Sequence, residues 1–300
     1  MAPDIATKTE LYVPNANNSD TDFIGFSFNG VTSESLGIMR VSEGSRYTEQ
    51  MLPNFQDKTA QMPGSDYTLY WESFYNTKSW TIQIAFDSMN ENQMKLFRQT
   101  FNTKNLGELS FDERPGIHWL AKVQSPPQLK YICFEEDGNR IYKGEGTITM
   151  ISYYPFGMSN NITKSNIVSN NESTNKFNND GDIPMEWIAI FQSGQLSNLR
   201  SIECQNKVNN SFTTYGKIFF NNGISITDTY LALNSKTNLL EGCSAFNTSA
   251  GTYTSTGNIY NNYITSGDFF KIPVGEFKFL PQGNNTYPTC YRLFYRTLYL

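Results

Sequence analysis

The chain has 300 residues, enough for one large domain or two ordinary ones, and carries a formal net charge of −5 at pH 7. The acidity lies in the first half, because residues 1–157 hold 13 Lys and Arg against 19 Asp and Glu, whereas residues 158–300 hold 10 against 9. Two classes of protein are disfavoured, since the chain has neither a basic stripe for gripping nucleic acid nor an apolar stretch long enough to cross a membrane.

The composition indicates a mainly β fold. Aromatic residues make up 15% of the chain, with 22 Phe and 18 Tyr, and bulky aromatic side chains favour strands. Asn is also frequent, and its amide competes for backbone hydrogen bonds in turns rather than in helix interiors. We therefore expect short strands punctuated by many turns.

The N-terminal part begins with a polar segment and continues into strands. Residues 1–22 lack the apolar core of a secretory signal, so we expect a mobile arm on a protein made in the cytoplasm. Phe23–Phe28 leads into Asn29-Gly30, the dipeptide best suited to a tight hairpin turn. Apolar and mostly polar residues then alternate over Trp80–Phe86, which predicts a strand with one face in the core.

One helix is expected directly after this strand. Ser88 and Glu91 have the spacing of a capping box, and Gly107 marks the expected end. The apolar residues that fall on one face of this helix are Met94, Phe97 and Phe101.

Further strands complete a first domain, which we place at residues 23–157. They are expected at Leu109–Phe111, Ile117–Val123, Tyr131–Phe134 and Thr147–Ile151. A turn is expected at Asp137-Gly138-Asn139, and the Gly144-Glu145-Gly146 run, which lacks the rest of a phosphate-binding loop, is interpreted as a kinked strand.

The second half is expected to be a separate β-sandwich. Residues 158–182 are rich in Asn, Ser and Thr and poor in apolar residues, which predicts a linker or exposed loop. Residues 183–300 then contain short apolar runs between Gly and Asn turns, a spacing typical of a sandwich. These runs are Trp187–Phe191, Lys217–Phe220, Tyr230–Leu233, Phe269–Ile272 and Tyr291–Tyr299.

Several segments, taken together, resemble the distal tail protein (Dit) family of long-tailed bacteriophages. In the first half they are Phe26-Ser27-Phe28-Asn29-Gly30 with Leu36-Gly37-Ile38, Met62-Pro63-Gly64-Ser65-Asp66, Leu109-Ser110-Phe111-Asp112-Glu113-Arg114-Pro115, and Gly144-Glu145-Gly146-Thr147-Ile148 running into Tyr154-Pro155-Phe156-Gly157. A weaker likeness covers Asn178-Asn179-Asp180-Gly181-Asp182 and Phe269-Phe270-Lys271-Ile272-Pro273-Val274-Gly275.

The resemblance implies a β belt domain with one helix, followed by a galectin-like or carbohydrate-binding-module-like sandwich. It also implies a hexameric ring in the virion, at the tip of the tail, which joins the tail tube protein to the hub and to receptor-binding proteins. DNA would pass through the lumen without specific binding, so we expect acidic residues of the first domain to line it. No cofactor, metal or catalytic residue belongs to that role.

The residues that could support catalysis are few and poorly placed. His118 is the sole histidine, lies within an expected strand, and is interpreted as an ordinary strand residue rather than a catalyst. A glycosidase needs two converging carboxyl groups, but in Asp112-Glu113 and Glu135-Glu136 adjacent residues would face opposite ways. The four cysteines, Cys133, Cys204, Cys243 and Cys290, form no CxxC pair and are expected to be free thiols.

A binding role remains open as an alternative. The tyrosines Tyr253, Tyr260, Tyr263 and Tyr291 offer flat faces that suit host-surface glycans, although core packing explains most tyrosines equally well. The rival readings to a structural ring are therefore a monomeric carbohydrate-binding module and, less favoured, a β-sandwich hydrolase.

Overall fold

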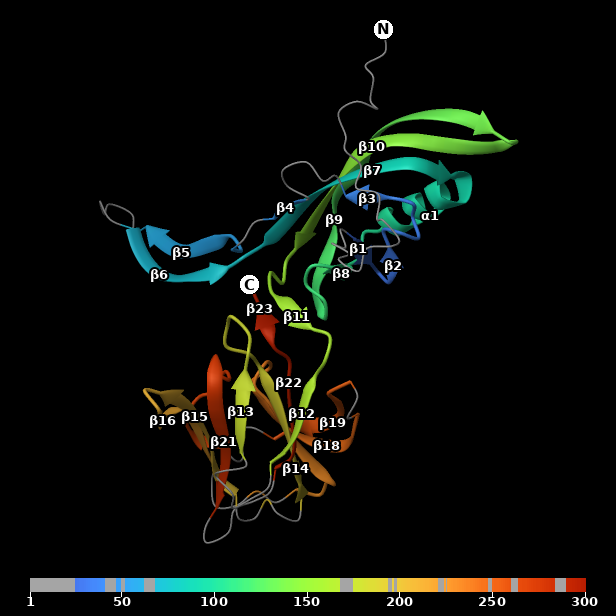
Figure 1. Cartoon of the computed structure of the whole chain (residues 1–300). Helices are drawn as coiled ribbons and strands as arrows, with labels where there is room; N and C mark the ends of the chain where they lie inside the picture. Colours follow the sequence, from blue (N-terminus) through green and yellow to red (C-terminus); the bar gives the residue numbers. More distant parts are fainter. Residues whose placement is uncertain are drawn as a thin grey trace. The chain divides into compact units, whose positions relative to one another are not determined.

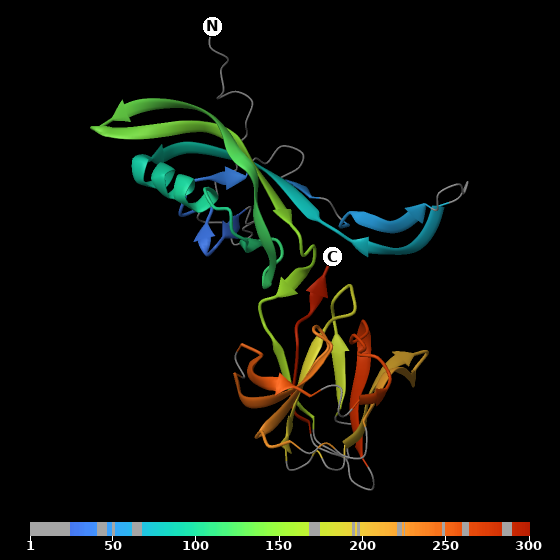
Figure 2. The same cartoon turned by 180° about the vertical axis from the view of Figure 1, so that it is seen from behind.

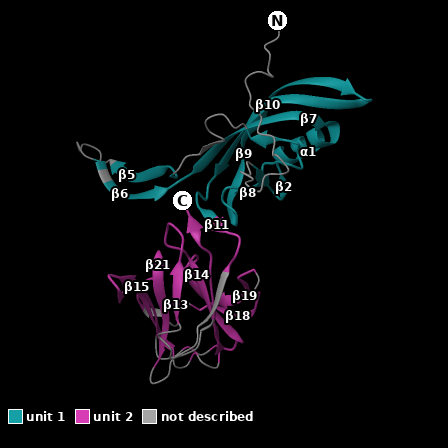
Figure 3. Ribbon diagram, viewed as in Figure 1, with its two compact units in different colours: residues 1–157, 300 teal, residues 158–299 magenta. Residues whose placement is uncertain are grey.

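The computed structural model describes residues 25–40, 47–49, 52–61, 68–167, 175–193, 196, 199–220, 224, 226–247, 250–259, 264–283 and 290–300. The predicted N-terminal arm, residues 1–22, lies outside these ranges. The chain divides into two compact units, residues 1–157 with Leu300 and residues 158–299 (Figure 3).

The first unit is built on a large antiparallel sheet with strand order β2-β1-β8-β9-β10-β7-β3, and β4 also pairs with β7 (Figure 1). Its elements are β1 (Phe26–Phe28), β2 (Val31–Thr32), β3 (Met39–Arg40), β4 (Tyr47–Glu49), β5 (Phe55–Gln61), β6 (Thr68–Tyr75), β7 (Lys78–Asn90), α1 (Glu91–Phe101), β8 (Gly107–Phe111), β9 (Ile117–Glu136) and β10 (Asn139–Ser152). Strands β5 and β6 pair with each other and form a separate two-stranded sheet.

The core of this unit depends on β7. Trp80, Ile82 and Ile84 are fully buried, and the predicted alternation is confirmed. Burial of each such side chain contributes about 1.5–3 kcal/mol to folding. The first residue of the strand, Lys78, is also buried, and its ammonium lies 5.8 Å from the ring centroid of Trp80 and 5.5 Å from that of Trp119. These distances are within the range of cation–π attraction.

Helix α1 covers one face of the sheet, as the view from behind shows (Figure 2). The predicted apolar face is confirmed, because Met94, Phe97 and Phe101 are all buried. Phe101 stacks on Phe28 of β1, with ring centroids 5.9 Å apart. The helix therefore closes the core from the side of β1.

The helix begins and ends at residues other than those predicted. Its N-cap is Asn90, which accepts a hydrogen bond from Gln93 N at 2.9 Å, while Gln93 Oε1 accepts one from Asn90 N at 3.0 Å. Ser88 instead lies within β7, because the strand continues to Asn90. At the other end the helix stops at Phe101, and Gly107 begins β8.

Strand β9 is longer than predicted. The sequence predicts two strands, Ile117–Val123 and Tyr131–Phe134, and Pro126 and Pro127 lie between them. The structure has one strand: β8 pairs with β9 up to Ala121, and from Lys122 to Glu136 β9 pairs with β10, with a register shift where Pro126 and Pro127 lie. A proline is tolerated at such a shift because the ladder is interrupted there and does not require its N–H.

The two predicted turns of the first unit are confirmed. Asn29 and Gly30 have φ values of 52° and 77°, and Asp137 and Gly138 have 48° and 75°. Two consecutive positive φ values are the mark of a type I′ turn, which joins β1 to β2 and β9 to β10. In β10 the register shifts between Tyr142 and Gly144, so the Gly144-Glu145-Gly146 run is a kinked strand as predicted.

The second unit is a β-sandwich, and the predicted mainly β fold with one helix is confirmed. One sheet has the order β12-β22-β14-β17-β18-β19 and the other β13-β21-β15-β16-β20. Its strands are β12 (Thr163–Ile167), β13 (Lys176–Asn179), β14 (Trp187–Gln192), β15 (Leu199–Val208), β16 (Ser211–Phe220), β17 (Tyr230–Asn234), β18 (Leu239–Asn247), β19 (Thr252–Asn258), β20 (Ile264–Ser266), β21 (Gly275–Gly283) and β22 (Cys290–Tyr295). The short strands β11 (Gly157–Ser159) and β23 (Leu298–Tyr299) pair with each other and belong to neither of these two sheets.

Aromatic contacts hold the two sheets face to face. Trp187 of β14 lies 5.0 Å from Phe279 of β21, and Phe277 of β21 lies 5.8 Å from Tyr295 of β22, all measured between ring centroids. All four side chains are 5% exposed or less. The sandwich thus has an aromatic core of its own.

Two predictions for the second half are wrong in detail. The predicted linker at 158–182 contains β12 and β13, which pair with β22 and β21, because backbone hydrogen bonds to a neighbouring strand do not require apolar side chains. Phe269–Ile272 is not a strand and forms only an isolated bridge between Ile272 and Met185. The segment packs as core instead, and Trp187 Nε1 donates to Phe270 O at 2.8 Å.

The two segments that carry the weaker resemblance meet at Asn179. This side chain is 1% exposed, donates from Nδ2 to Ile183 O and Pro273 O at 3.2 Å each, and accepts from Gly181 N at 3.1 Å. A buried side-chain amide whose N–H groups and oxygen are all hydrogen-bonded holds the bonded segments in one arrangement. Asn179 therefore ties the loop after β13 to the loop before β21.

The capping geometry gives a first testable outcome. Asn90→Ala removes the hydrogen bond to Gln93 N and should lower the free energy of unfolding by about 1 kcal/mol. Ser88 is exposed, and Ser88→Ala is the matched control, which should change the free energy of unfolding by much less. Urea titration of the two variants measures the difference. Equal effects would place the cap elsewhere.

A second outcome concerns where the sandwich begins. A fragment of residues 158–300 should fold alone, whereas a fragment of residues 183–300 should not, because it lacks β12, β13 and the bonds of Asn179. Cooperative thermal unfolding followed by near-ultraviolet circular dichroism distinguishes the two. A cooperative transition in the shorter fragment would show that these strands are dispensable.

Candidate functional site

The histidine considered for catalysis lies in the sheet. His118 is on β9 opposite Ser110 of β8 and is 6% exposed, next to the fully buried Trp119. Both faces of β9 are therefore covered at this point, which leaves no open surface at the imidazole for a substrate.

The carboxylates considered for catalysis have structural contacts or lie on the surface. Glu113 forms an ion pair with the buried guanidinium of Arg40, which also lies 5.7 Å from the ring centroid of Phe111. Asp112 approaches Gly25, where an added Cβ would overlap its carboxylate, and burial raises its pKa while the charge of Arg40 partly opposes that shift. Glu135-Glu136 is exposed at the end of β9. Asp112 and Glu113 thus both lie within electrostatic range of Arg40, and Glu113 is engaged in an ion pair with it.

Other chemical sites are not found among the residues that the structure describes. No three His, Cys, Asp or Glu side chains there are placed to hold a metal ion.

The cysteines that the structure describes are free thiols. They are Cys133, Cys204 and Cys243, and burial raises the pKa of Cys204 to about 12, so its thiol is inert. No helix in the described ranges is long and apolar enough to cross a membrane.

The most unusual surface is hairpin β5–β6, which carries aromatic residues on both faces. Phe55 pairs with Tyr75, with ring centroids 5.0 Å apart, and Tyr70 lies on the same face through the hydrogen bond between its hydroxyl and Ser73. Trp71 and Phe74 belong to the other face. The exposed fractions are 60% for Phe55, 60% for Tyr70, 61% for Trp71, 44% for Phe74 and 37% for Tyr75.

Sequence reasoning missed this hairpin. A signal was available, because aromatic runs flank Pro63-Gly64, a turn dipeptide. The resembling segment Met62–Asp66 itself lies outside the described residues. What the sequence does not reveal is that, among the residues that the structure describes, the hairpin aromatics stay largely exposed and only Tyr75 makes a ring contact outside the hairpin, with Phe156 at 5.3 Å between centroids.

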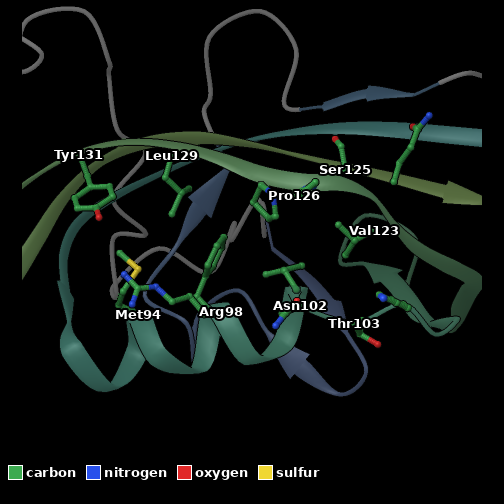
Figure 4. A pocket seen from close by; sticks show the side chains of 14 residues that line it. Met94, Arg98, Asn102, Thr103, Val123, Ser125, Pro126, Leu129 and Tyr131 are labelled. Carbon is green, nitrogen blue, oxygen red and sulfur yellow. The ribbon is translucent and has the colours of Figure 1, made fainter.

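A groove of about 580 Å³ lies between α1 and the central part of β9. Leu129 and Tyr131 of β9 point toward Met94 and Arg98 of α1 across it (Figure 4). Its floor is apolar, and its lining includes the two cations Arg98 and Lys104 but no Asp or Glu. The groove therefore offers an apolar, positively charged surface.

The second unit has a polar network on one sheet face, centred on Glu203. The carboxylate accepts from Thr214 Oγ1 at 2.7 Å and Gln205 Nε2 at 2.8 Å, and pairs with Lys217 Nζ at 3.1 Å. Burial alone would raise the pKa of Glu203, but these donors together lower it below its usual value. The donors and acceptors of this network bond to one another, so the network stabilises the sheet and is not a binding site for a ligand.

Of the four tyrosines considered for glycan binding, the structure describes the side chain of Tyr253 alone. The Tyr253 hydroxyl donates to Glu241 and accepts from Asn234 Nδ2 at 3.2 Å, and burial raises the pKa of Tyr253 to about 12. Its ring packs on a small core cluster of the sandwich. Tyr260 and Tyr263 lie outside the described residues, as does the side chain of Tyr291.

Comparison with known proteins finds similarity in structure alone. No protein-family model matches the chain, and no curated protein matches it. The structure of Dit (gp 19.1) of phage SPP1, described as a paradigm of the hub adsorption apparatus of Gram-positive infecting phages, aligns with a TM-score of 0.53 at 9% identity. The alignment covers 92% of this chain and 99% of that one, so the two proteins share a fold.

Two other structures are too distant to carry an argument. A chain of the phage P2 baseplate in its activated conformation with Ca aligns at a TM-score of 0.36 and 9% identity, covering 86% of this chain and 93% of that chain. A fructofuranosidase from Schwanniomyces occidentalis in complex with fructose aligns at 0.20 and 8% identity, covering 81% of this chain and 59% of the other.

The Glu203 network makes the stability of the protein depend on pH. Because folding lowers the pKa of Glu203, its stabilisation is present above the unfolded-state pKa of about 4.3 and is lost as the pH falls through the folded-state value. Glu203→Gln should therefore lower the free energy of unfolding by about 1–3 kcal/mol at pH 7 and by progressively less below pH 4.

Chemical denaturation between pH 3 and 7 measures this difference. Glu276→Gln is the matched control, since Glu276 pairs with Lys207 at 2.6 Å in a more exposed position and should contribute less. A loss that stays constant across the pH range would show that the charge of Glu203 is not what stabilises the fold.

Proposed function

We propose that this chain is a structural, non-enzymatic protein of the tail tip of a long-tailed bacteriophage. Six copies form a ring that joins the tail tube to the hub and to receptor-binding proteins. The observation that carries the proposal is the fold shared with SPP1 Dit over both units, since 92% of this chain aligns with 99% of that one. A likeness confined to the sandwich would support no such role, because sandwiches host many unrelated functions.

The chemistry of the chain agrees with this role. The groups considered for catalysis are occupied by structural contacts, such as the Glu113–Arg40 ion pair, or lie exposed at a hairpin end. The first unit carries hairpin β5–β6, whose exposed aromatic faces suit contact with another protein. That unit makes the ring contacts in our proposal, and the second unit is an accessory to it.

The charge distribution also fits a conduit for DNA. Residues 1–157 hold 19 acidic and 13 basic residues, so the ring-forming unit carries the negative charge of the chain. A lumen lined by carboxylates repels phosphates and lets DNA pass without binding.

The mass of the purified protein tests the proposal. Light scattering coupled to size exclusion should give six times the chain mass of 34.2 kDa. The chain truncated after Gly157 should keep the sixfold state, and the fragment 158–300 should be a monomer. A full-length monomer at high micromolar concentration would refute the ring.

A further inference from the structure

We propose that hairpin β5–β6 of one copy docks into the groove between α1 and β9 of the next copy. This inference rests on the proposed ring and names the contact that builds it. The occupant of the groove is a second copy of this chain.

The hairpin needs a partner to be stable. A two-stranded sheet alone is at best marginally stable in water, because neither face is shielded and few contacts offset the entropy of ordering. Here both faces carry aromatic side chains, and Trp71 and Phe55 are 61% and 60% exposed. Covering them would remove a large apolar area from water, which favours association.

The hairpin cannot reach the groove of its own chain. Strand β6 runs almost directly into β7, and α1 begins where β7 ends, so the hairpin and the helix lie at opposite ends of one 13-residue strand (Figure 1). A strand rises about 3.3 Å per residue, which separates the two surfaces by roughly 40 Å. The two surfaces can therefore meet only between copies.

The two surfaces are complementary in character and in charge. The groove has an apolar floor that includes Phe97, Val123 and Leu129, and it accepts side chains of the kind the hairpin exposes. Its two charged lining residues, Arg98 and Lys104, are both basic. Residues 55–75 hold three acidic residues and one basic residue. Opposite charges set the register of such a contact and speed the encounter.

The geometry predicts a closed assembly. A contact between two different surfaces is heterologous, because each copy offers its hairpin to one neighbour and its groove to the other. Such contacts generate a ring when the rotation between copies closes. The contact thus accounts for a ring without any further interface of the second unit.

Two complementary variants test the contact. The hairpin variant combines Trp71→Ser with Phe74→Ser, both exposed positions, and the groove variant combines Arg98→Glu with Lys104→Glu. Each variant alone should be a monomer by light scattering. Mixed at equal amounts, they should form a heterodimer and stop there, because only one junction, between the hairpin of the groove variant and the groove of the hairpin variant, is intact.

The heterodimer also shows that both variants are folded. Tyr215→Ser, an exposed aromatic of the second unit, and Lys95→Glu, an exposed cation of α1 outside the groove, are the matched controls and should leave the sixfold mass unchanged. A sixfold mass in the hairpin variant, or no heterodimer from the mixture, would overturn this contact while leaving the proposed ring intact. A monomeric wild type would overturn both.

A crosslinking experiment on the assembled protein maps the contact directly. A photoreactive phenylalanine analogue at position 71 should crosslink between copies to residues of α1 or β9, as identified by mass spectrometry of the digested adduct. Crosslinks to the second unit or to another hairpin would refute the proposed pairing, and adducts formed only with a different tail protein would assign the hairpin to that partner instead.

Discussion

Strand β7 is the element on which the first unit depends, because it serves three purposes at once. Its inward side chains, Trp80, Ile82 and Ile84, are fully buried and form the centre of the core. Its backbone pairs with β10 along one edge and with β3 and β4 along the other. Its two ends carry the aromatic hairpin and the helix, so the strand fixes the spacing between the two surfaces that we propose to meet in the assembly. A shift in its register by one residue would turn the core side chains outward.

The second unit is organised by a different kind of interaction. Its aromatic core would support a sandwich in many topologies, but the buried Asn179 hydrogen-bonds to Pro273 O and Ile183 O and fixes how two loops meet. The Glu203 network then ties β15 to β16 and β21 through charged and polar groups. Apolar burial provides the stability of this unit, and polar networks specify its arrangement.

The sequence predicts the features that depend on local pattern. Rules that act within a few residues predict three features: the alternation over Trp80–Phe86, the apolar helix face that includes Phe97, and the Asn29-Gly30 turn. The N-cap is misplaced because Ser88 and Asn90 are both good caps, and only the length of β7 decides between them. The continuity of β9 through Pro126 depends on strand neighbours distant in the sequence, and so do strands β12 and β13.

The candidate interface also depends on the arrangement of distant segments, since the local sequence around Trp71 does not indicate that the aromatic side chains of the hairpin are exposed. The most direct test of the account is a cryo-electron microscopy map of the purified assembly. We predict sixfold symmetry, with density for the β5–β6 hairpin of each copy lying in the groove lined by Arg98 and Leu129 of its neighbour. A map in which the copies meet only through their sandwiches, with the hairpins free in solvent, would contradict it.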